Sequence, residues 1–151
     1  MASHEVSAAE VGQIYLELHH RVHRIVDQTM AAAGLSLARA KVLMRLREHG
    51  PMNQATLAGL LSFAPRSVTD FVDALERDGL VSRAEDQHDR RARVVSLTPA
   101  GSDAHEAAQI ARCKAMGEIF GSLTATERAS LAALLTTIRT NLESGEHTCE
   151  Q

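Results

Sequence analysis

The stretch NQATLAGLLSFAPRSVTDFVDALERDG, residues 53–79, decides the fold of this chain. Asn53 is a suitable N-cap for a short helix that ends at the break Ser62-Phe63-Ala64. Pro65 suits the first turn of a second helix, which ends at Gly79. Apolar residues recur at helical spacing in both helices: Leu57, Ala58, Leu60 and Leu61 in the first, and Val68, Phe71, Val72 and Leu75 in the second. A short helix, a tight turn and a longer helix predict a helix-turn-helix.

The sequence that follows predicts a two-stranded β-hairpin. Leu80–Arg83 and Val94–Leu97 are short and rich in aliphatic and β-branched residues, which is typical of strands. The segment between them, 84–93, is polar apart from two alanines, and three of its last four residues are arginines. We therefore expect a solvated, basic hairpin tip, which beside a helix-turn-helix forms the wing of a winged helix.

Long helices are predicted before this region. Ser7-Ala8-Ala9-Glu10 fits a capping box, and apolar residues at three-four spacing continue to Ala33, before a terminating Gly34. A helix over residues 8–33 would be about 39 Å long, which is too long to be buried within a small domain. We therefore expect it to dock against a second chain. A further helix is predicted from its N-cap Ser36 to Gly50-Pro51.

Two more long helices are predicted after the hairpin. Thr98-Pro99 predicts the start of a helix that runs to about Gly121, with the threonine as N-cap and the proline in the first position. Thr124-Ala125-Thr126-Glu127 forms a second capping box, which opens a last helix with apolar residues through to Leu142.

Composition indicates one soluble globular domain. The 151 residues are 44% hydrophobic and 23% charged, and no apolar run has the length of a membrane helix. Cys113 and Cys149 cannot form a disulfide framework, and the first residues lack a secretory signal, so we expect a cytoplasmic protein. Aromatic residues make up only 3%, which disfavours single-strand readers that stack bases. The net charge of -3 does not exclude DNA binding, because residues 36–47 carry four basic side chains and no acid.

Three motifs in this order of elements resemble the MarR (multiple antibiotic resistance regulator) family. They are Leu75-Glu76-Arg77-Asp78-Gly79-Leu80-Val81, Asp89-Arg90-Arg91-Ala92-Arg93-Val94 and Leu97-Thr98-Pro99-Ala100-Gly101. The resemblance implies a mainly α (α+β) fold, a winged helix-turn-helix with long N- and C-terminal dimerisation helices. The DNA-binding domain would span 36–98, the dimerisation helices 7–35 and 99–143, and a flexible tail 144–151. It further implies a homodimeric, ligand-responsive transcription factor, usually a repressor, that binds a pseudo-palindromic operator.

DNA contacts are expected at the start of the second helix of the motif and in the wing. At the helix start the dipole favours phosphate and side chains reach base edges. The candidates there are Pro65, Arg66, Ser67, Thr69 and Asp70. In the wing, the resemblance implies Arg91 in the minor groove, Asp89 orienting it, and Arg90 and Arg93 on phosphates.

Several of these DNA assignments have alternatives. Ser67 and Thr69 could simply cap the helix or lie on its surface, and the wing could be a solvated hairpin. Asp70 would repel phosphate, so it would accept from a cytosine amino group or pair with an arginine. Ala64 stands where such proteins often have a capping side chain, and its absence costs the helix ~1 kcal/mol.

The resemblance also implies an effector pocket where the first helix meets the second and the helix after the wing. The candidate lining residues are Tyr15, His19, His23, Arg39 and Leu43, which would suit a small aromatic or anionic ligand. Half-buried interface histidines are the more common explanation of His19, His20 and His23, and a metal site is disfavoured because no third ligand is evident. Cys113 is expected to be a buried, inert thiol.

The motifs of common enzymes are missing from the sequence. It contains no phosphate-binding glycine loop, no His-Glu-x-x-His and no nucleophile elbow, so we expect neither catalysis nor a cofactor. The sequence predicts a transcriptional regulator that binds specific double-stranded DNA as a homodimer, with a small aromatic or anionic effector. The alternative is a degenerate winged-helix module whose basic face binds an acidic protein.

Overall fold

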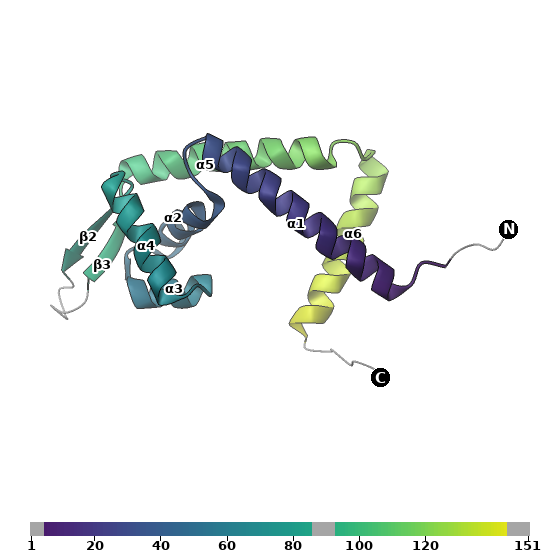
Figure 1. The fold of residues 1–151 in the computed structure, drawn as a ribbon, viewed down its shortest axis with the longest axis horizontal. Helices are drawn as coiled ribbons and strands as arrows, with labels where there is room; N and C mark the ends of the chain where they lie inside the picture. Colours follow the sequence, from purple (N-terminus) through teal and green to yellow (C-terminus); the bar gives the residue numbers. More distant parts are fainter. Residues whose placement is uncertain (1–4, 86–92, 145–151) are drawn as a thin grey trace. The chain divides into compact units, whose positions relative to one another are not determined.

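The computed structural model describes residues 5–85 and 93–144 (Figure 1). The elements are α1 (Ala8–Ala32), α2 (Leu37–His49), β1 (Met52–Asn53), α3 (Gln54–Leu61), α4 (Pro65–Arg77), β2 (Val81–Glu85), β3 (Arg93–Leu97), α5 (Pro99–Phe120) and α6 (Ala125–Glu143). The chain up to Ala115 forms one compact unit, and the chain from Met116 forms a second. Within the described ranges, none of the helices combines the length and apolarity that a membrane span requires.

The core of the first unit lies where α2, α3, α4 and β3 pack together. Its completely buried side chains are Val42 and Leu43 of α2, Leu57 of α3, Val68, Val72 and Leu75 of α4, and Val95 of β3. Burying one such side chain stabilises the fold by about 1.5–3 kcal/mol. The predicted helix-turn-helix is confirmed, and Leu60 is the exception to its apolar pattern because 40% of its surface is exposed.

A three-stranded antiparallel sheet completes the winged helix, with the strand order β1-β3-β2. The hairpin pairs Val81 with Leu97 and Glu85 with Arg93, so the predicted wing is confirmed where the structure describes it. The strand β1 was not predicted from the sequence. It pairs Met52 with Val95, and a strand of only two residues has no periodicity that a sequence could reveal.

The predicted helix caps are present in the structure. At the start of α1 the backbone N–H of Glu10 donates to Ser7 Oγ (3.2 Å), and the N–H of Ser7 donates to the Glu10 carboxylate (2.8 Å). Thr124 and Glu127 form the same reciprocal pair at the start of α6, and these hydrogen bonds lower the pKa of Glu127. Gly34 ends α1 with φ +97°, the left-handed conformation that was predicted for it.

The Leu97-Thr98-Pro99-Ala100-Gly101 motif joins the wing to α5. The Thr98 hydroxyl donates to the Gly79 carbonyl (2.7 Å) and accepts from the N–H of Gly101 (3.0 Å). A Cβ on Gly101 would lie 2.9 Å from the carbonyl carbon of Leu80, closer than real Cβ atoms come. The motif therefore brings the first turn of α5 directly against the backbone between α4 and β2.

Cys113 is exposed, so the expectation of a buried thiol is wrong for this chain. The buried side of α5 consists of Gly101, His105, Ala108 and Ala115, which recur at helical spacing. Cys113 lies two positions before Ala115, and two positions along a helix turn a side chain to the opposite side.

Candidate nucleic-acid interface

Helix α4 has one buried and one exposed side, as a DNA-reading helix requires. Val68, Val72 and Leu75 are completely buried against the core. The exposed residues are Pro65, Arg66, Thr69, Asp70, Asp73 and Arg77, and Ser67 is half-buried. The expected contact residues at the start of α4 therefore share one short segment of which most is accessible to solvent.

The N-terminus of α4 lacks a side-chain cap. Ala64 is the N-cap residue and makes no side-chain hydrogen bond, while Pro65 occupies the first turn. Backbone N–H groups in the first turn of an uncapped helix remain available to a phosphate, which the helix dipole also favours. Arg66 is exposed in this same turn, so a positive side chain and the positive end of the helix lie together.

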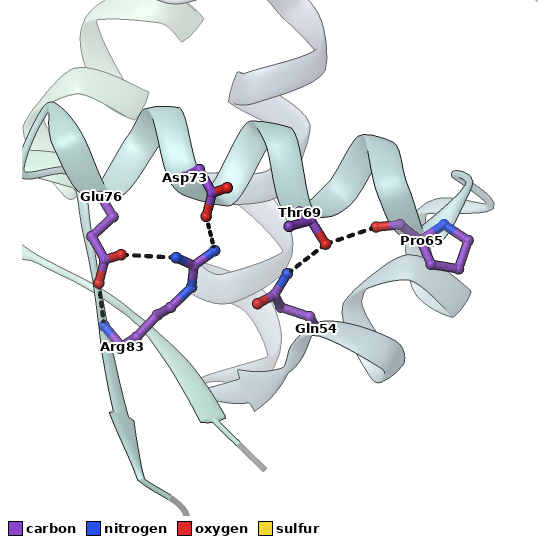
Figure 2. A network of polar contacts seen from close by, with 6 residues as sticks. All are labelled: Gln54, Pro65, Thr69, Asp73, Glu76 and Arg83. Carbon is purple, nitrogen blue, oxygen red and sulfur yellow. Dashed lines mark hydrogen bonds and ion pairs between the residues drawn. The ribbon is translucent and has the colours of Figure 1, made fainter. Parts of the chain in front are cut away.

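Thr69 is already hydrogen-bonded within the protein. Its hydroxyl donates to the carbonyl of Pro65 (3.1 Å) and accepts from Gln54 Nε2 of α3 (3.1 Å), as Figure 2 shows. With its proton engaged, this hydroxyl can offer DNA only its second lone pair, beside the methyl group. Gln54 was missed from the sequence, where it is only the residue after the N-cap Asn53. An open hollow of about 500 Å³ between α3 and α4 is lined in part by Gln54 and Thr69.

Arg83 of β2 binds two carboxylates of α4 (Figure 2). Its Nη2 lies 2.5 Å from Asp73 Oδ1, and its Nη1 lies 2.8 Å from Glu76 Oε2. The backbone N–H of Arg83 also donates to Glu76 Oε1 (3.2 Å). The exposed fraction of the Arg83 side chain is only 11%. This cluster was not predicted from the sequence, because its members belong to different elements.

Asp70 is exposed on α4, and no ion pair of it is seen among the residues that the structure describes. Its neighbour Asp73, one turn further on, is the carboxylate that pairs with an arginine. Both roles expected for Asp70, acceptance from a cytosine amino group and pairing with an arginine, stay predictions, because Arg90 and Arg91 lie outside the described residues.

In the wing, the last residue of β2 is Glu85 and the first residue of β3 is Arg93. Arg93 is exposed and pairs in register with Glu85, so it lies at the base of the predicted hairpin tip. The other wing residues that were expected to contact DNA, Asp89, Arg90 and Arg91, lie outside the described residues.

The expected effector residues divide into two sets. Tyr15, His19 and His23 are exposed on α1, with ring centroids 5.9 Å apart for Tyr15 and His19 and 6.1 Å apart for His19 and His23. Arg39 instead forms an ion pair with Asp78 at the end of α4, and Leu43 is completely buried. Among the described residues, no hydrogen bond, ion pair or ring contact joins the two sets. Leu43 therefore has no surface to offer a ligand in this conformation.

His19, His20 and His23 lie close together on α1. His20 lies 6.0 Å from His19, centroid to centroid, and His23 lies on the following turn. Across residues 5–85 and 93–144, no group of three or more His, Cys, Asp or Glu side chains could hold a metal ion.

His105 of α5 is a buried titratable group that the sequence analysis did not single out. It is 7% exposed, its Nδ1 lies 3.5 Å from Arg47 Nη1 of α2, and its Nε2 lies 3.5 Å from Gln109 Nε2. Burial lowers the pKa of His105, and the positive charge of Arg47 lowers it further. Neutral His105 therefore forms part of the contact between α2 and α5.

These features define a DNA-binding protein of the helix-turn-helix class. The fold is a winged helix, and α4, the second helix of its helix-turn-helix, has one side buried in the core and the other exposed. The basic side chain of Arg66 lies at the N-terminus of α4. The MarR family profile matches residues 35–92. The HTH-type transcriptional repressor NicR of Pseudomonas putida is 30% identical over 127 residues, which cover 83% of this chain and 80% of NicR. The chain belongs to the MarR family of DNA-binding transcriptional regulators.

Solved structures agree with this assignment. The YusO protein from Bacillus subtilis has a TM-score of 0.75 and 26% identity, and the match covers 89% of this chain and 99% of YusO. BpsR of Bordetella bronchiseptica has a TM-score of 0.68 and 25% identity, over 86% of this chain and 98% of BpsR. DNA binding by BpsR is regulated by 6-hydroxynicotinic acid.

Proposed function

We propose that this chain is a homodimeric repressor that binds a pseudo-palindromic operator in the cytoplasm. In this proposal α4 enters the major groove and the wing contacts the minor groove and phosphates. The exposed N-terminal turns of α4, opposite a fully buried side, are the observation that carries the DNA-reading role. The name of NicR, a repressor, supports repression over activation.

The dimer is supported by apolar surface on two helices. On α1, Val11, Ile14 and Leu18 are 49%, 61% and 45% exposed at helical spacing. On α6, none of the described residues is buried, although Leu134, Ile138 and Leu142 recur along the helix and are 64%, 49% and 55% exposed. Contiguous apolar surface of this kind marks an interaction site, and an identical chain supplies a matching surface. We therefore assign the flanking helices, 7–35 and 99–143, to dimerisation and 36–98 to DNA binding.

The operator and the dimer can be tested in one set of measurements. Sedimentation at micromolar concentration should give a dimer, and gel shift with the intergenic DNA beside the protein's own gene should give a specific complex. Two half-sites should lie about one helical turn apart, and affinity should fall linearly with salt on a log–log scale. A monomer, or an affinity that salt does not change, would contradict the proposal. Binding to an acidic protein without any DNA complex would favour the interaction module instead.

The effector that we propose is a small aromatic acid. Its support is the ligand of BpsR and the Tyr15–His19–His23 rings, which offer flat surface and hydrogen-bond donors for a carboxylate. A ligand of this kind would favour a dimer spacing that does not fit the operator, with a coupling of about 1–3 kcal/mol. Titration of salicylate and 6-hydroxynicotinic acid into the operator complex, with His19→Ala in parallel, tests it. If millimolar ligand changes neither operator affinity nor melting temperature, the effector assignment is wrong.

A further inference from the structure

The Arg83 cluster joins the two parts of the winged helix that must reach DNA together. Asp73 and Glu76 lie on α4, whereas Arg83 lies on β2, the strand that leads into the wing. Only the short turn 78–80 connects these elements along the chain. Because a turn of this length can bend, the side-chain contacts help to fix the direction of β2 relative to α4.

The geometry of the cluster depends on a guanidinium. Two different nitrogens of Arg83 bind two different carboxylates, at 2.5 Å and 2.8 Å, which the planar fork of arginine allows. A lysine ammonium is a single point charge and reproduces such a fork poorly. Without Arg83, Asp73 and Glu76 would stand three residues apart on one helix side and repel each other.

Arg83 is placed to act on the protein rather than on DNA. Its side chain is 11% exposed, compared with 48% for Asp73 and 39% for Glu76. A phosphate contact would need the guanidinium to be accessible, whereas here its two terminal nitrogens, Nη1 and Nη2, bind the carboxylates (Figure 2).

We infer that Arg83 is a positioning residue for operator recognition, which holds α4 and the wing strand β2 at the mutual angle that lets both fit one half-site. This inference rests on the proposed role of α4 and the wing in binding the operator. Recognition tolerates misplacement of only about 0.5 Å or 10–20°, so loosening this contact should weaken specific binding more than non-specific binding.

The test measures two properties of the full-length protein: amide hydrogen exchange without DNA, and affinity for the intergenic fragment and for an unrelated duplex. Arg83→Met should speed exchange in residues 73–83 by about fivefold or more, since local openings there become easier. It should weaken binding to the intergenic fragment by about tenfold. The control is Arg45→Met, which removes the ion pair between Arg45 and Glu48 inside α2. It should leave exchange in residues 73–83 unchanged, and the loss of a basic side chain should lower the affinity for both duplexes by no more than a similar factor.

Two further variants separate position from charge. The triple variant Arg83→Met/Asp73→Asn/Glu76→Gln has no unpaired carboxylates, so its non-specific binding should equal or exceed that of wild type, while its specific binding stays weak. Arg83→Lys should give exchange rates and affinities between those of wild type and Arg83→Met. If Arg83→Met does not fold, Arg83→Lys is compared with wild type in its place.

Three results would overturn the inference. The first two are hydrogen exchange as slow in Arg83→Met as in wild type, and an affinity of Arg83→Met for the intergenic fragment equal to that of wild type. The third is full recovery of specific binding in the triple variant, which would mean that Arg83 only neutralises the charge of Asp73 and Glu76. If the wild-type protein binds both duplexes equally, the proposed operator function fails, and the exchange data alone decide whether Arg83 fixes α4 to β2.

Discussion

Replacing Gly101 by alanine should destabilise the protein, although alanine favours helices. In the third position of α5, the change would normally stabilise the helix by about 1 kcal/mol. Here the new Cβ would lie 2.9 Å from both the Leu80 carbonyl carbon and Leu97 Cδ1, and closer still to the Leu80 carbonyl oxygen. Ordinary carbon contacts are about 3.5–4.0 Å, so relieving the two carbon contacts alone requires α5 to move by at least about 0.6 Å, and the contact with the carbonyl oxygen requires a larger movement.

The loss in the free energy of unfolding can be estimated from the contacts that a movement of α5 would strain. Overpacking of this kind costs about 1–3 kcal/mol, and the backbone of Leu80 cannot rotate away as a side chain could. The movement also strains the hydrogen bond from Thr98 to the Gly79 carbonyl, which contributes about 0.5–1.5 kcal/mol. After the gain in helix propensity is subtracted, we expect a net loss of about 1–3 kcal/mol in the free energy of unfolding.

Urea unfolding followed by circular dichroism measures this loss, with all variants at the same protein concentration because dimers gain stability by mass action. The matched control is Gly117→Ala in the same helix, where an added Cβ meets nothing within 4 Å. The control should be stabilised by about 0.5–1 kcal/mol. If Gly101→Ala is as stable as Gly117→Ala, the close approach of α5 to the turn after α4 is not a real feature of the fold.

Three other changes test the site and its support. Ala64→Ser supplies the missing N-cap of α4 and should raise the free energy of unfolding by about 1 kcal/mol; a urea midpoint at or below that of wild type would contradict the assigned helix start. Arg66→Ala removes two arginines from each dimer and should reduce the slope of log affinity against log salt by about 1.8, and an unchanged slope would mean that Arg66 touches no phosphate. His105→Gln should flatten the pH dependence of stability. The pKa of His105 is lowered in the folded state, so the unfolded chain binds the proton first and wild-type stability falls as pH drops below about 6.5. Equal pH dependence in the two proteins would exclude His105 as its source.

The sequence predicted the features that depend on neighbours a few residues away. The capping boxes at Ser7 and Thr124, the N-cap at Asn53 and the left-handed Gly34 were all confirmed. Each is formed by hydrogen bonds or backbone angles within one turn of the chain, so the residue types alone indicate it. The alternation of buried and exposed residues in α4 was predicted for the same reason.

The sequence could not show which side chains meet across elements. Gln54 binds Thr69 from another helix, and Arg83 reaches back to Asp73 and Glu76 from a strand. Nothing in the spacing of these residues distinguishes such partners from ordinary exposed charges. The sequence also could not show how deeply a single residue is buried. Leu43 was expected to line a ligand pocket, and in this structure it is completely buried in the core.

The charges of α4 suggest that different parts of the protein supply the affinity for DNA and the choice of sequence. The helix carries three acidic residues, Asp70, Asp73 and Glu76, against the two basic residues Arg66 and Arg77. Alone, such a helix would be repelled by phosphate. Arg83 compensates part of this negative charge from β2, so that acidic and basic side chains on the two elements approach balance. A nearly neutral helix adds little to the electrostatic part of binding, which basic side chains on phosphates must then supply. It follows that substitutions of Thr69 and Asp70 on the exposed side of α4 should mainly change which sequence is bound, whereas neutralising Arg66 or the arginines of the wing should weaken binding to every sequence.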